Sequence, residues 1–230
     1  SLYQVTYSGG PNFAFDHCTE CTNFDELEGI DLSALNCLYN GAEPIRANTL
    51  HNFLQKFERF GLRDSQLLTC YGMAEATLAI STSKLGTKPT ILEADSEILK
   101  TGKFESAKSA ENTAFLVSAG FPKNGLEVII VHHETRLKLE EDVIGEIWVK
   151  GSSVAKGYWK KETETQDIFH AKEESAQKDN YLRTGDLGFL HQGEVFITGR
   201  LKDLIIVKGL NYYAQDLELH AFDESCKTIQ

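Results

Sequence analysis

The densest group of residues that could do chemistry lies between Leu182 and Glu218. Charged side chains alternate there with glycines and short β-branched runs: Arg183, Asp186, Glu194, Arg200, Lys202, Asp203 and Lys208. A buried strand does not need so many charges, because an unpaired buried charge costs free energy. Carboxylates and guanidinium groups together instead suit a ligand that carries hydroxyls and phosphate.

Asp186 and Arg200 are the strongest candidates in this stretch. Asp186 ends a Thr-Gly-Asp sequence, where the glycine allows a turn that exposes the carboxylate. A carboxylate can accept hydrogen bonds from vicinal hydroxyls such as those of a ribose. Arg200 follows Gly199, and its planar guanidinium suits phosphate or ribose oxygens. The alternative is a surface hairpin over Leu187–Ile197, turning at Gly193, with ordinary solvated charges.

The stretch from RTGDLGF to Glu218 resembles a motif of the adenylate-forming enzymes, which include acyl-CoA synthetases, peptide-synthetase adenylation domains and luciferases. YGMAEATL over Tyr71–Leu78 is a second matching motif. Within this group, the four motifs are most similar to those of the fatty acyl-AMP ligases. The other two motifs are SGGPNFAFD over Ser8–Asp16 and NGAEPIR over Asn40–Arg46. Four motifs in order along almost the whole chain favour this family over the surface-hairpin interpretation.

The resemblance implies a nucleotide site. A Gly-Ala-Glu sequence would pass along the adenine, Tyr71 would stack on its ring, and Asp186 with Arg200 would hold ribose and phosphate. Backbone of Gly72 and Met73 would lie next to the nucleotide and the acyl carbonyl. The full set implied to bind nucleotide is Gly41, Ala42, Glu43, Tyr71, Gly72, Met73, Ala74, Asp186 and Arg200.

Glu75 is implied to be the ligand of Mg²⁺, an ion that spans phosphate oxygens and offsets charge during displacement. Many relatives carry Thr where this chain has Ala74, and that hydroxyl touches the phosphate. Fatty acyl-AMP ligases commonly carry Ala there, so the departure narrows the subfamily. The alternative is that Glu75 flanks a helix start, where a carboxylate stabilises by ~0.3–1 kcal/mol.

The first motif is implied to line the channel for a fatty acyl chain. The strand predicted over Leu2–Tyr7 ends at the glycines, and a helix is predicted from Asn12 with Pro11 near its first turn. The sequence is not G-x-G-x-x-G, so a plain strand-to-helix turn is the alternative. The implied acyl-side residues are Ser8, Gly9, Gly10, Asn12 and Phe13.

Periodicity predicts an α/β fold. Leu35–Tyr39 and Leu67–Cys70 are typical of buried parallel strands, and the apolar spacing from Leu50 to Phe60 predicts a helix closed by Gly61. Polar loops follow both strands, and ligands of open α/β sheets bind at those ends. Together with this pattern, the resemblance implies that the chain holds the second half of an adenylate-forming large domain, a small antiparallel β subdomain and the start of a mobile C-terminal domain.

The second half has the pattern of an antiparallel sheet. Leu126–Val131 and Glu146–Val149 are expected strands, and the charged stretch 160–179 predicts a solvated helix. Gly157-Tyr158-Trp159 resembles a family landmark, whose aromatic side chains we interpret as packing. The expected domains are residues 1–118, 119–198 and 199–230.

Two further features follow from the resemblance. Lys202 is implied to be the hinge before the small mobile domain, and we count it with Glu75 as a catalytic candidate. Residues 86–114 are polar with a weak apolar rhythm, which predicts a long connection with little regular structure. They resemble the insertion that restrains the mobile domain of fatty acyl-AMP ligases and withholds acyl-adenylate from coenzyme A. The alternative is a surface excursion without function.

Composition excludes some classes of function. The formal net charge of −11 argues against non-specific binding of nucleic acid or anionic membrane. No apolar run approaches the ~18 residues of a membrane span, and Ser1 does not begin a signal-peptide pattern. The cysteines are odd in number and not densely spaced, which indicates reduced thiols and a cytoplasmic setting: Cys18, Cys21, Cys37, Cys70 and Cys226.

Two patterns that mimic metal sites have simpler explanations. Cys18 and Cys21 form C-x-x-C, but no second such pair follows and the flanks predict a helix, so we interpret them as helix packing. His132 and His133 are adjacent in an extended segment, where neighbours face opposite sides and cannot share a metal.

The resemblance implies a ligase that uses ATP and Mg²⁺ to convert a fatty acid to acyl-AMP and pyrophosphate. The acyl group would pass to the phosphopantetheine arm of an acyl carrier protein or a carrier domain of a polyketide or peptide synthase. The alternatives are an acyl-CoA synthetase and a non-catalytic fragment that binds nucleotide or a partner. The family's lysine-containing phosphate loop is absent before Ser8, its C-terminal lysine is absent after Glu218, and there is no initiator Met. We therefore expect a fragment that is inactive alone.

Overall fold

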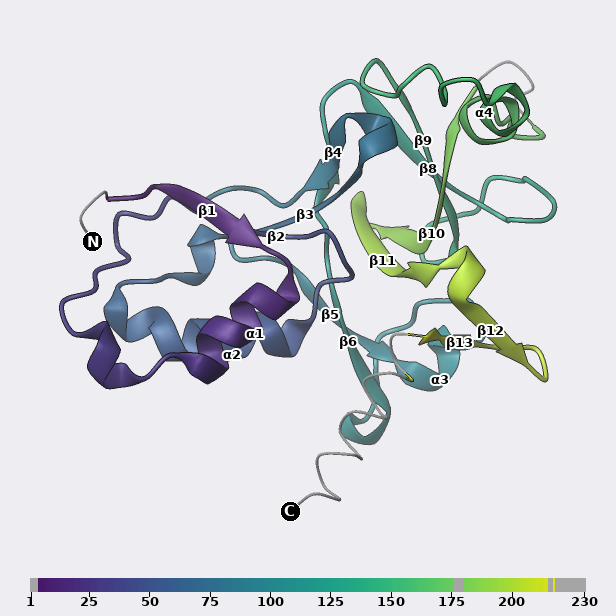
Figure 1. Cartoon of the computed structure of the whole chain (residues 1–230). Helices are drawn as coiled ribbons and strands as arrows, with labels where there is room; N and C mark the ends of the chain where they lie inside the picture. The colour runs from purple at the N-terminus through teal and green to yellow at the C-terminus, as the bar shows by residue number, and fades with distance from the viewer. Residues whose placement is uncertain (1–3, 176–179, 215–216, 218–230) are drawn as a thin grey trace.

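The first half of the chain is built on a mixed sheet in the order β1-β2-β3-β4-β7, of which Figure 1 labels the first four strands. The computed structural model describes residues 4–175, 180–214 and 217. β1, β2 and β3 run parallel, as predicted, whereas β4 and β7 are antiparallel additions. The strands are β1 (Tyr7–Gly10), β2 (Cys37–Asn40), β3 (Leu67–Met73), β4 (Leu78–Thr82) and β7 (Phe121–Pro122).

Two helices, α1 (Asn12–Cys21) and α2 (Ala47–Phe57), cover one face of the parallel strands (Figure 1). Phe15 of α1 packs edge-on against Phe53 of α2, with ring centroids 4.8 Å apart. Both predicted helices are confirmed. The second ends in a 3-10 turn whose cap, Gly61, has φ 91°, a conformation that favours glycine.

The first strand lies later than predicted. The expected strand was Leu2–Tyr7, but β1 is Tyr7–Gly10, and residues 1–3 lie outside the described residues. The glycines do not break the strand. A Cβ on Gly9 would come within 2.3 Å of the Tyr39 carbonyl oxygen, so the close approach of β1 and β2 requires glycine there.

The second half is an antiparallel sheet in the order β11-β10-β9-β8. Its strands are β8 (Leu126–Val131), β9 (Gly145–Gly151), β10 (Leu182–His191) and β11 (Glu194–Arg200), which confirms the two strands predicted there. The helix predicted over 160–179 is shorter: α4 is Glu162–Phe169, because the chain then returns to the sheet where Ala171 bridges Tyr181. Residues 176–179 lie outside the described part.

Residues 86–114 are ordered, so the prediction of little regular structure is wrong. β5 (Ile91–Asp95) pairs with β6 (Thr113–Val117), and α3 (Ser96–Leu99) follows β5. Phe104 stacks on Phe189 of β10, with ring centroids 5.3 Å apart and an interplanar angle of 11°. The weak apolar periodicity of this segment gave no sign that residues such as Phe104 pack against strands distant in sequence.

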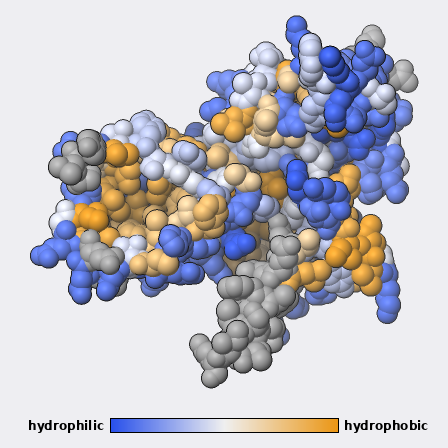
Figure 2. Space-filling view, viewed as in Figure 1, coloured by the Kyte–Doolittle hydropathy of each residue, from blue (hydrophilic) through white to orange (hydrophobic). Residues whose placement is uncertain are grey.

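A hairpin follows the expected hinge: β12 (Leu204–Val207) and β13 (Leu210–Tyr213). Positive φ values of 52° and 79° at Lys208 and Gly209 give the two-residue turn typical of hairpins. The Asn211 N–H donates to the Lys100 carbonyl at 2.8 Å, so the hairpin rests on the segment that contains α3. Apolar residues of β12 form an exposed patch (Figure 2): Ile205, Ile206 and Val207.

The domain boundaries at 118 and 198 stay a prediction. Residues 215–216 and 218–230, which include the expected C-terminal stub and Cys226, lie outside the described residues. Among the residues that are described, no helix is long and apolar enough to cross a membrane.

Phe104→Ala should lower the free energy of unfolding of this chain by about 3–5 kcal/mol, since truncating a buried aromatic side chain leaves a cavity. Phe115→Ala is the matched control, because Phe115 lies on the neighbouring β6 and is 54% exposed. Urea denaturation followed by circular dichroism measures both. A loss no larger than that of the control would contradict the packing of residues 86–114 on the β10–β11 hairpin.

Candidate functional site

Three of the sequence motifs meet at one edge of the first sheet. β1, β2 and β3 are parallel and in register, with Gly10 beside Asn40 and Asn40 beside Thr69. Their carboxyl ends therefore lie together, which is where open α/β sheets bind ligands. The expected acyl residues span the end of β1 and the start of α1, the loop expected to border adenine follows β2, and the Tyr-Gly-Met sequence ends β3.

Asp186 on β10 is the centre of a polar cluster. Strand register places it opposite Arg200 on β11, and Arg200 Nε donates to Asp186 Oδ1 at 3.0 Å. Tyr71 Oη, from β3, donates to Asp186 Oδ2 at 2.7 Å. The structure thus brings together three predicted nucleotide residues from two motifs and two sheets. The hairpin that was the alternative interpretation is also present. Its two strands carry Asp186 and Arg200, so the hairpin positions the two candidate residues and does not exclude a site.

The hydrogen bond to Asp186 fixes the orientation of the Tyr71 ring. Burial, with the charge of Asp186 adding to it, raises the pKa of Tyr71 well above its usual value, so the phenol stays protonated and donates. Each carboxylate oxygen has two lone pairs. Asp186 can therefore hold Tyr71 and Arg200 and still accept hydrogen bonds from a ribose.

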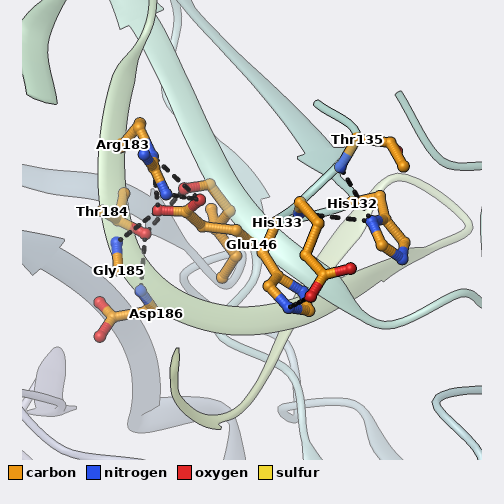
Figure 3. Close-up of polar contacts among 10 residues, drawn as sticks. His132, His133, Thr135, Glu146, Arg183, Thr184, Gly185 and Asp186 are labelled. Carbon is orange, nitrogen blue, oxygen red and sulfur yellow. Dashed lines mark hydrogen bonds and ion pairs between the residues drawn. The ribbon is translucent and has the colours of Figure 1, made fainter. Parts of the chain in front are cut away.

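The predicted turn that exposes the Asp186 carboxylate is wrong: Asp186 lies within strand β10, and its side chain is 13% exposed. A buried glutamate holds this segment of β10 (Figure 3). Glu146 on β9 is 1% exposed and accepts from Arg183 Nε at 3.1 Å and Arg183 Nη2 at 2.9 Å. The Gly185 N–H also donates to Glu146 Oε1, at 3.3 Å. A charge buried this deeply is stable only when paired and hydrogen-bonded, and Glu146 meets both conditions.

Thr184 completes the support of this segment of β10. Its hydroxyl donates to the Ile147 carbonyl at 2.7 Å and accepts from the Asp186 N–H at 3.0 Å. The sequence interpretation counted Arg183 as a candidate charge but saw Glu146 only as the start of a strand. The signal that could have found the pair is a single carboxylate in one apolar strand and a single guanidinium in another.

Glu75 lies in a short 3-10 turn (Ala74–Ala76) directly after β3. Tyr158 Oη donates to Glu75 Oε1 at 2.7 Å, and burial with this hydrogen bond raises the pKa of Tyr158 to about 12. The Tyr158 ring also packs edge-on against Phe169, so its interpretation as packing was incomplete. Trp159 is 86% exposed, and the packing interpretation is wrong for it.

The backbone around Glu75 is tightly constrained. A Cβ on Gly72 would come within 1.7 Å of the Leu78 carbonyl oxygen, so this position cannot carry a side chain. Thr77 and Leu78 adopt positive φ values of 60° and 96°, which are unfavourable for residues with a Cβ. Such strain gathers at functional sites in proteins and agrees with a ligand-facing backbone here.

The acyl and adenine motifs are joined through Asn12. The Asn12 N–H donates to Glu43 Oε1 and its Nδ2 donates to the Pro44 carbonyl, each at 2.8 Å. Asn40 Nδ2 donates to Asn12 Oδ1 at 3.3 Å. Asn12 is 1% exposed, whereas Phe13 is 71% exposed. Asn12 therefore connects the first motif to the loop after β2 by hydrogen bonds. The contacts of the first motif with an acyl chain stay a prediction.

The adenine loop after β2 needs a glycine and a left-handed residue. A Cβ on Gly41 would lie 2.6 Å from Cys70 Sγ and 2.7 Å from the Cys70 carbonyl oxygen, and Ala42 has φ 76°. Lys202 lies apart from this loop, exposed in the turn Leu201–Asp203 between β11 and β12. That position fits a hinge, and the hinge itself stays a prediction.

The residues present fit Mg²⁺ only as a companion of a nucleotide. Among the described residues, no three His, Cys, Asp or Glu side chains converge in a way that could hold a metal ion. Glu75 could supply one carboxylate. Mg²⁺ commonly takes one or two protein carboxylates and completes its octahedron with phosphate oxygens and waters. A single glutamate is sufficient for that mode when a bound nucleotide supplies the phosphate oxygens.

The two patterns that mimic metal sites differ in detail from prediction: the cysteines are not packed, and the two histidines do not face opposite sides. Cys18 and Cys21 lie in α1, as expected, but both are exposed, so they do not pack. His132 and His133 follow the last residue of β8 and stack on each other, with centroids 5.2 Å apart (Figure 3). The expectation of opposite faces was wrong because strand alternation ends at Val131.

Comparisons with known proteins point to one kind of enzyme. Residues 2–159 match the family model described as AMP-binding enzyme. The chain is 46% identical over 222 residues to the medium-chain-fatty-acid–[acyl-carrier-protein] ligase JamA of Moorena producens, covering 95% of this chain and 38% of JamA. It is 38% identical to the ligase of the same description, TtuA, of Teredinibacter turnerae, covering 95% of this chain and 35% of TtuA.

The structure is similar to that of the fatty acyl-adenylate ligase from L. pneumophila, solved in complex with acyl adenylate and pyrophosphate. The TM-score is 0.84 at 41% identity, over 88% of this chain and 35% of that one. This chain thus spans between 35% and 38% of the length of these relatives.

Glu146→Gln should lower the free energy of unfolding by about 3–5 kcal/mol, because it leaves the largely buried Arg183 without its counter-charge. Glu164→Gln is the control: it breaks a pair with Lys161 at 2.9 Å whose side chains are 53% and 60% exposed. That exposed pair is worth at most about 1 kcal/mol. Urea denaturation of both variants gives the comparison, and equal effects would contradict a buried support beneath Asp186.

Proposed function

Because this chain belongs to the AMP-binding enzyme family, we propose that the whole protein is a ligase that activates a fatty acid with ATP. The products of the first step are acyl-AMP and pyrophosphate, and the acyl group then passes to the phosphopantetheine thiol of a carrier protein. The observation that carries the proposal is the hydrogen-bonded cluster of Tyr71, Asp186 and Arg200 beside the carboxyl ends of the parallel strands.

In this proposal each side chain of the cluster has a separate task. Asp186 accepts hydrogen bonds from the ribose hydroxyls through its remaining lone pairs. The Tyr71 ring, held by its hydroxyl, stacks on adenine, and the loop of Gly41, Ala42 and Glu43 borders the base. The Arg200 side chain is 53% exposed, so its outer nitrogens can reach ribose or phosphate oxygens.

The first chemical step is an in-line displacement. An oxygen of the fatty acid carboxylate attacks the α-phosphorus, the bond from that phosphorus to the bridging oxygen breaks, and pyrophosphate leaves. Catalysis of this kind depends on positioning and charge stabilisation, which the backbone at Gly72 and Met73 would support. Mg²⁺ bound at Glu75 would offset the phosphate charge. In the second step the carrier thiol attacks the acyl carbonyl and AMP leaves.

The choice of a fatty acid and a carrier protein rests on the relatives and on the segment 86–114. JamA and TtuA are named as ligases of medium-chain fatty acids and acyl-carrier protein. The segment contacts the β12–β13 hairpin, which would begin the mobile domain: Lys100 accepts from Asn211, and its Nζ lies 5.6 Å from the centroid of the Tyr212 ring. Such contacts would restrain the mobile domain and disfavour delivery to coenzyme A.

We place the protein in the cytoplasm, because the described cysteines are free thiols in the structure: Cys18, Cys21, Cys37 and Cys70. An acyl-CoA synthetase is the second candidate function. It differs only in the acceptor of the acyl group, so product analysis separates the two.

Glu75→Ala in the whole protein should reduce hydroxamate formation from fatty acid, ATP and hydroxylamine at least ~100-fold, the usual cost of losing an electrostatic group at a reacting phosphate. Glu58→Ala is the control, since Glu58 is exposed at the end of α2. An unchanged rate of hydroxamate formation for Glu75→Ala would contradict the proposal that Glu75 binds Mg²⁺.

Tyr212→Ala in the whole protein should raise the yield of CoA thioester relative to carrier-protein thioester by roughly two- to five-fold, since a cation–π contact of ~0.5–1 kcal/mol with Lys100 is lost. Leu137→Ala serves as the control because Leu137 is 48% exposed and lies in the loop that follows β8. Mass spectrometry of both thioesters gives the ratio. No change in that ratio would count against the restraint.

A further inference from the structure

The side chain that contacts Glu75 comes from a distant segment of the chain. Tyr158 lies between β9 and α4, and its hydroxyl donates to Glu75 Oε1 at 2.7 Å across a sequence separation of 83 residues. The contact therefore depends on the fold and does not arise from local geometry.

The segment around Tyr158 is attached to the Glu75 turn by two other hydrogen bonds. The Ala155 N–H donates to the Glu75 carbonyl at 2.7 Å. The Thr77 hydroxyl donates to the Ser153 carbonyl at 2.6 Å. Neither bond involves the phenol, so the two segments would stay together if the Tyr158 hydroxyl were removed.

The Tyr158 ring is also fixed from its other side. Its N–H donates to the Thr165 hydroxyl at 2.9 Å, and its ring packs edge-on against Phe169 with centroids 5.0 Å apart. Gly157 permits this close approach, because a Cβ there would lie 2.1 Å from Thr165 Cγ2. The ring position is thus set by α4, and Glu75 receives a donor of fixed direction.

A fixed donor on one oxygen of a carboxylate has a definite consequence for a metal. It occupies a lone pair of Oε1 and orients the group so that Oε2 is the better ligand. Mg²⁺ demands near-ideal octahedral geometry, and outer partners that orient a ligating carboxylate commonly change metal affinity 10–100-fold.

We propose that Tyr158 is a positioning residue that orients the Glu75 carboxylate for single-oxygen ligation of the Mg²⁺ carried by ATP. The inference rests on the proposed role of Glu75 and adds a residue to it. Tyr158 contacts neither the reacting atoms nor the nucleotide in this account. Its effect should appear in Mg²⁺-dependent binding before any turnover.

The test compares Tyr158→Phe with Tyr181→Phe in the whole protein. Tyr181 is a matched control, because it is buried and its hydroxyl donates to Glu127 Oε1 at 3.0 Å, away from Glu75. Isothermal titration calorimetry measures the affinity for α,β-methylene-ATP, which cannot be cleaved to acyl-AMP, with Mg²⁺ and with EDTA. AMP in EDTA reports on the nucleotide site alone.

Tyr158→Phe should weaken binding of the analogue in Mg²⁺ about 10-fold, while leaving AMP binding in EDTA and the thermal unfolding temperature at their original values. Tyr181→Phe should change neither affinity. The proposal is overturned if Tyr158→Phe keeps the original Mg²⁺ dependence, or if it weakens AMP in EDTA equally, which would indicate a structural role.

Glu75→Ala separates this inference from the proposed function. If Glu75→Ala removes the Mg²⁺ dependence and Tyr158→Phe does not alter it, only the inference about Tyr158 fails. If Glu75→Ala also leaves the Mg²⁺ dependence of the analogue's affinity unchanged, Glu75 does not bind Mg²⁺. The positioning role of Tyr158 is then contradicted as well.

Discussion

The carboxylate of Asp186 accepts hydrogen bonds from the two larger sheets of this chain, and the arrangement of the site depends on it. Tyr71 lies near the end of β3 in the first sheet, and Arg200 ends the strand that pairs with Asp186 in the second. A side chain that is 13% exposed and carries a negative charge needs such donors. The same hydrogen bonds hold the Tyr71 ring and the Arg200 guanidinium beside one carboxylate, which in the proposed function is the group that binds ribose.

Two hydrogen-bonded supports hold side chains of the candidate site. Glu146, which is buried, and Arg183 hold the segment of β10 before Asp186, and Tyr158 holds Glu75 from the segment after β9. Both supports join elements far apart in sequence. Partners of this kind restrict the rotamers of the groups they hold, which is what a site that acts by positioning requires.

Much of the fold and of the candidate site could be predicted from sequence, because the motifs lie next to strands whose apolar runs are plain. Two of the parallel strands, β2 and β3, and the Asp186–Arg200 hairpin followed from local patterns, whereas β1 begins where the predicted strand ends and includes the glycines expected to break it. The burial of Phe104 did not, since its partners on β10 and β11 are distant in sequence. For the same reason the roles of Glu146 and Tyr158 were missed: a hydrogen bond between distant residues leaves no local signal.

The most direct test of the central claim is a crystal structure of the whole protein bound to an acyl-AMP. The account predicts a ribose hydroxyl within about 3.2 Å of an Asp186 oxygen and the adenine stacked on the Tyr71 ring. An acyl-AMP bound with its ribose and adenine away from both residues would contradict the account, whatever activity the protein shows.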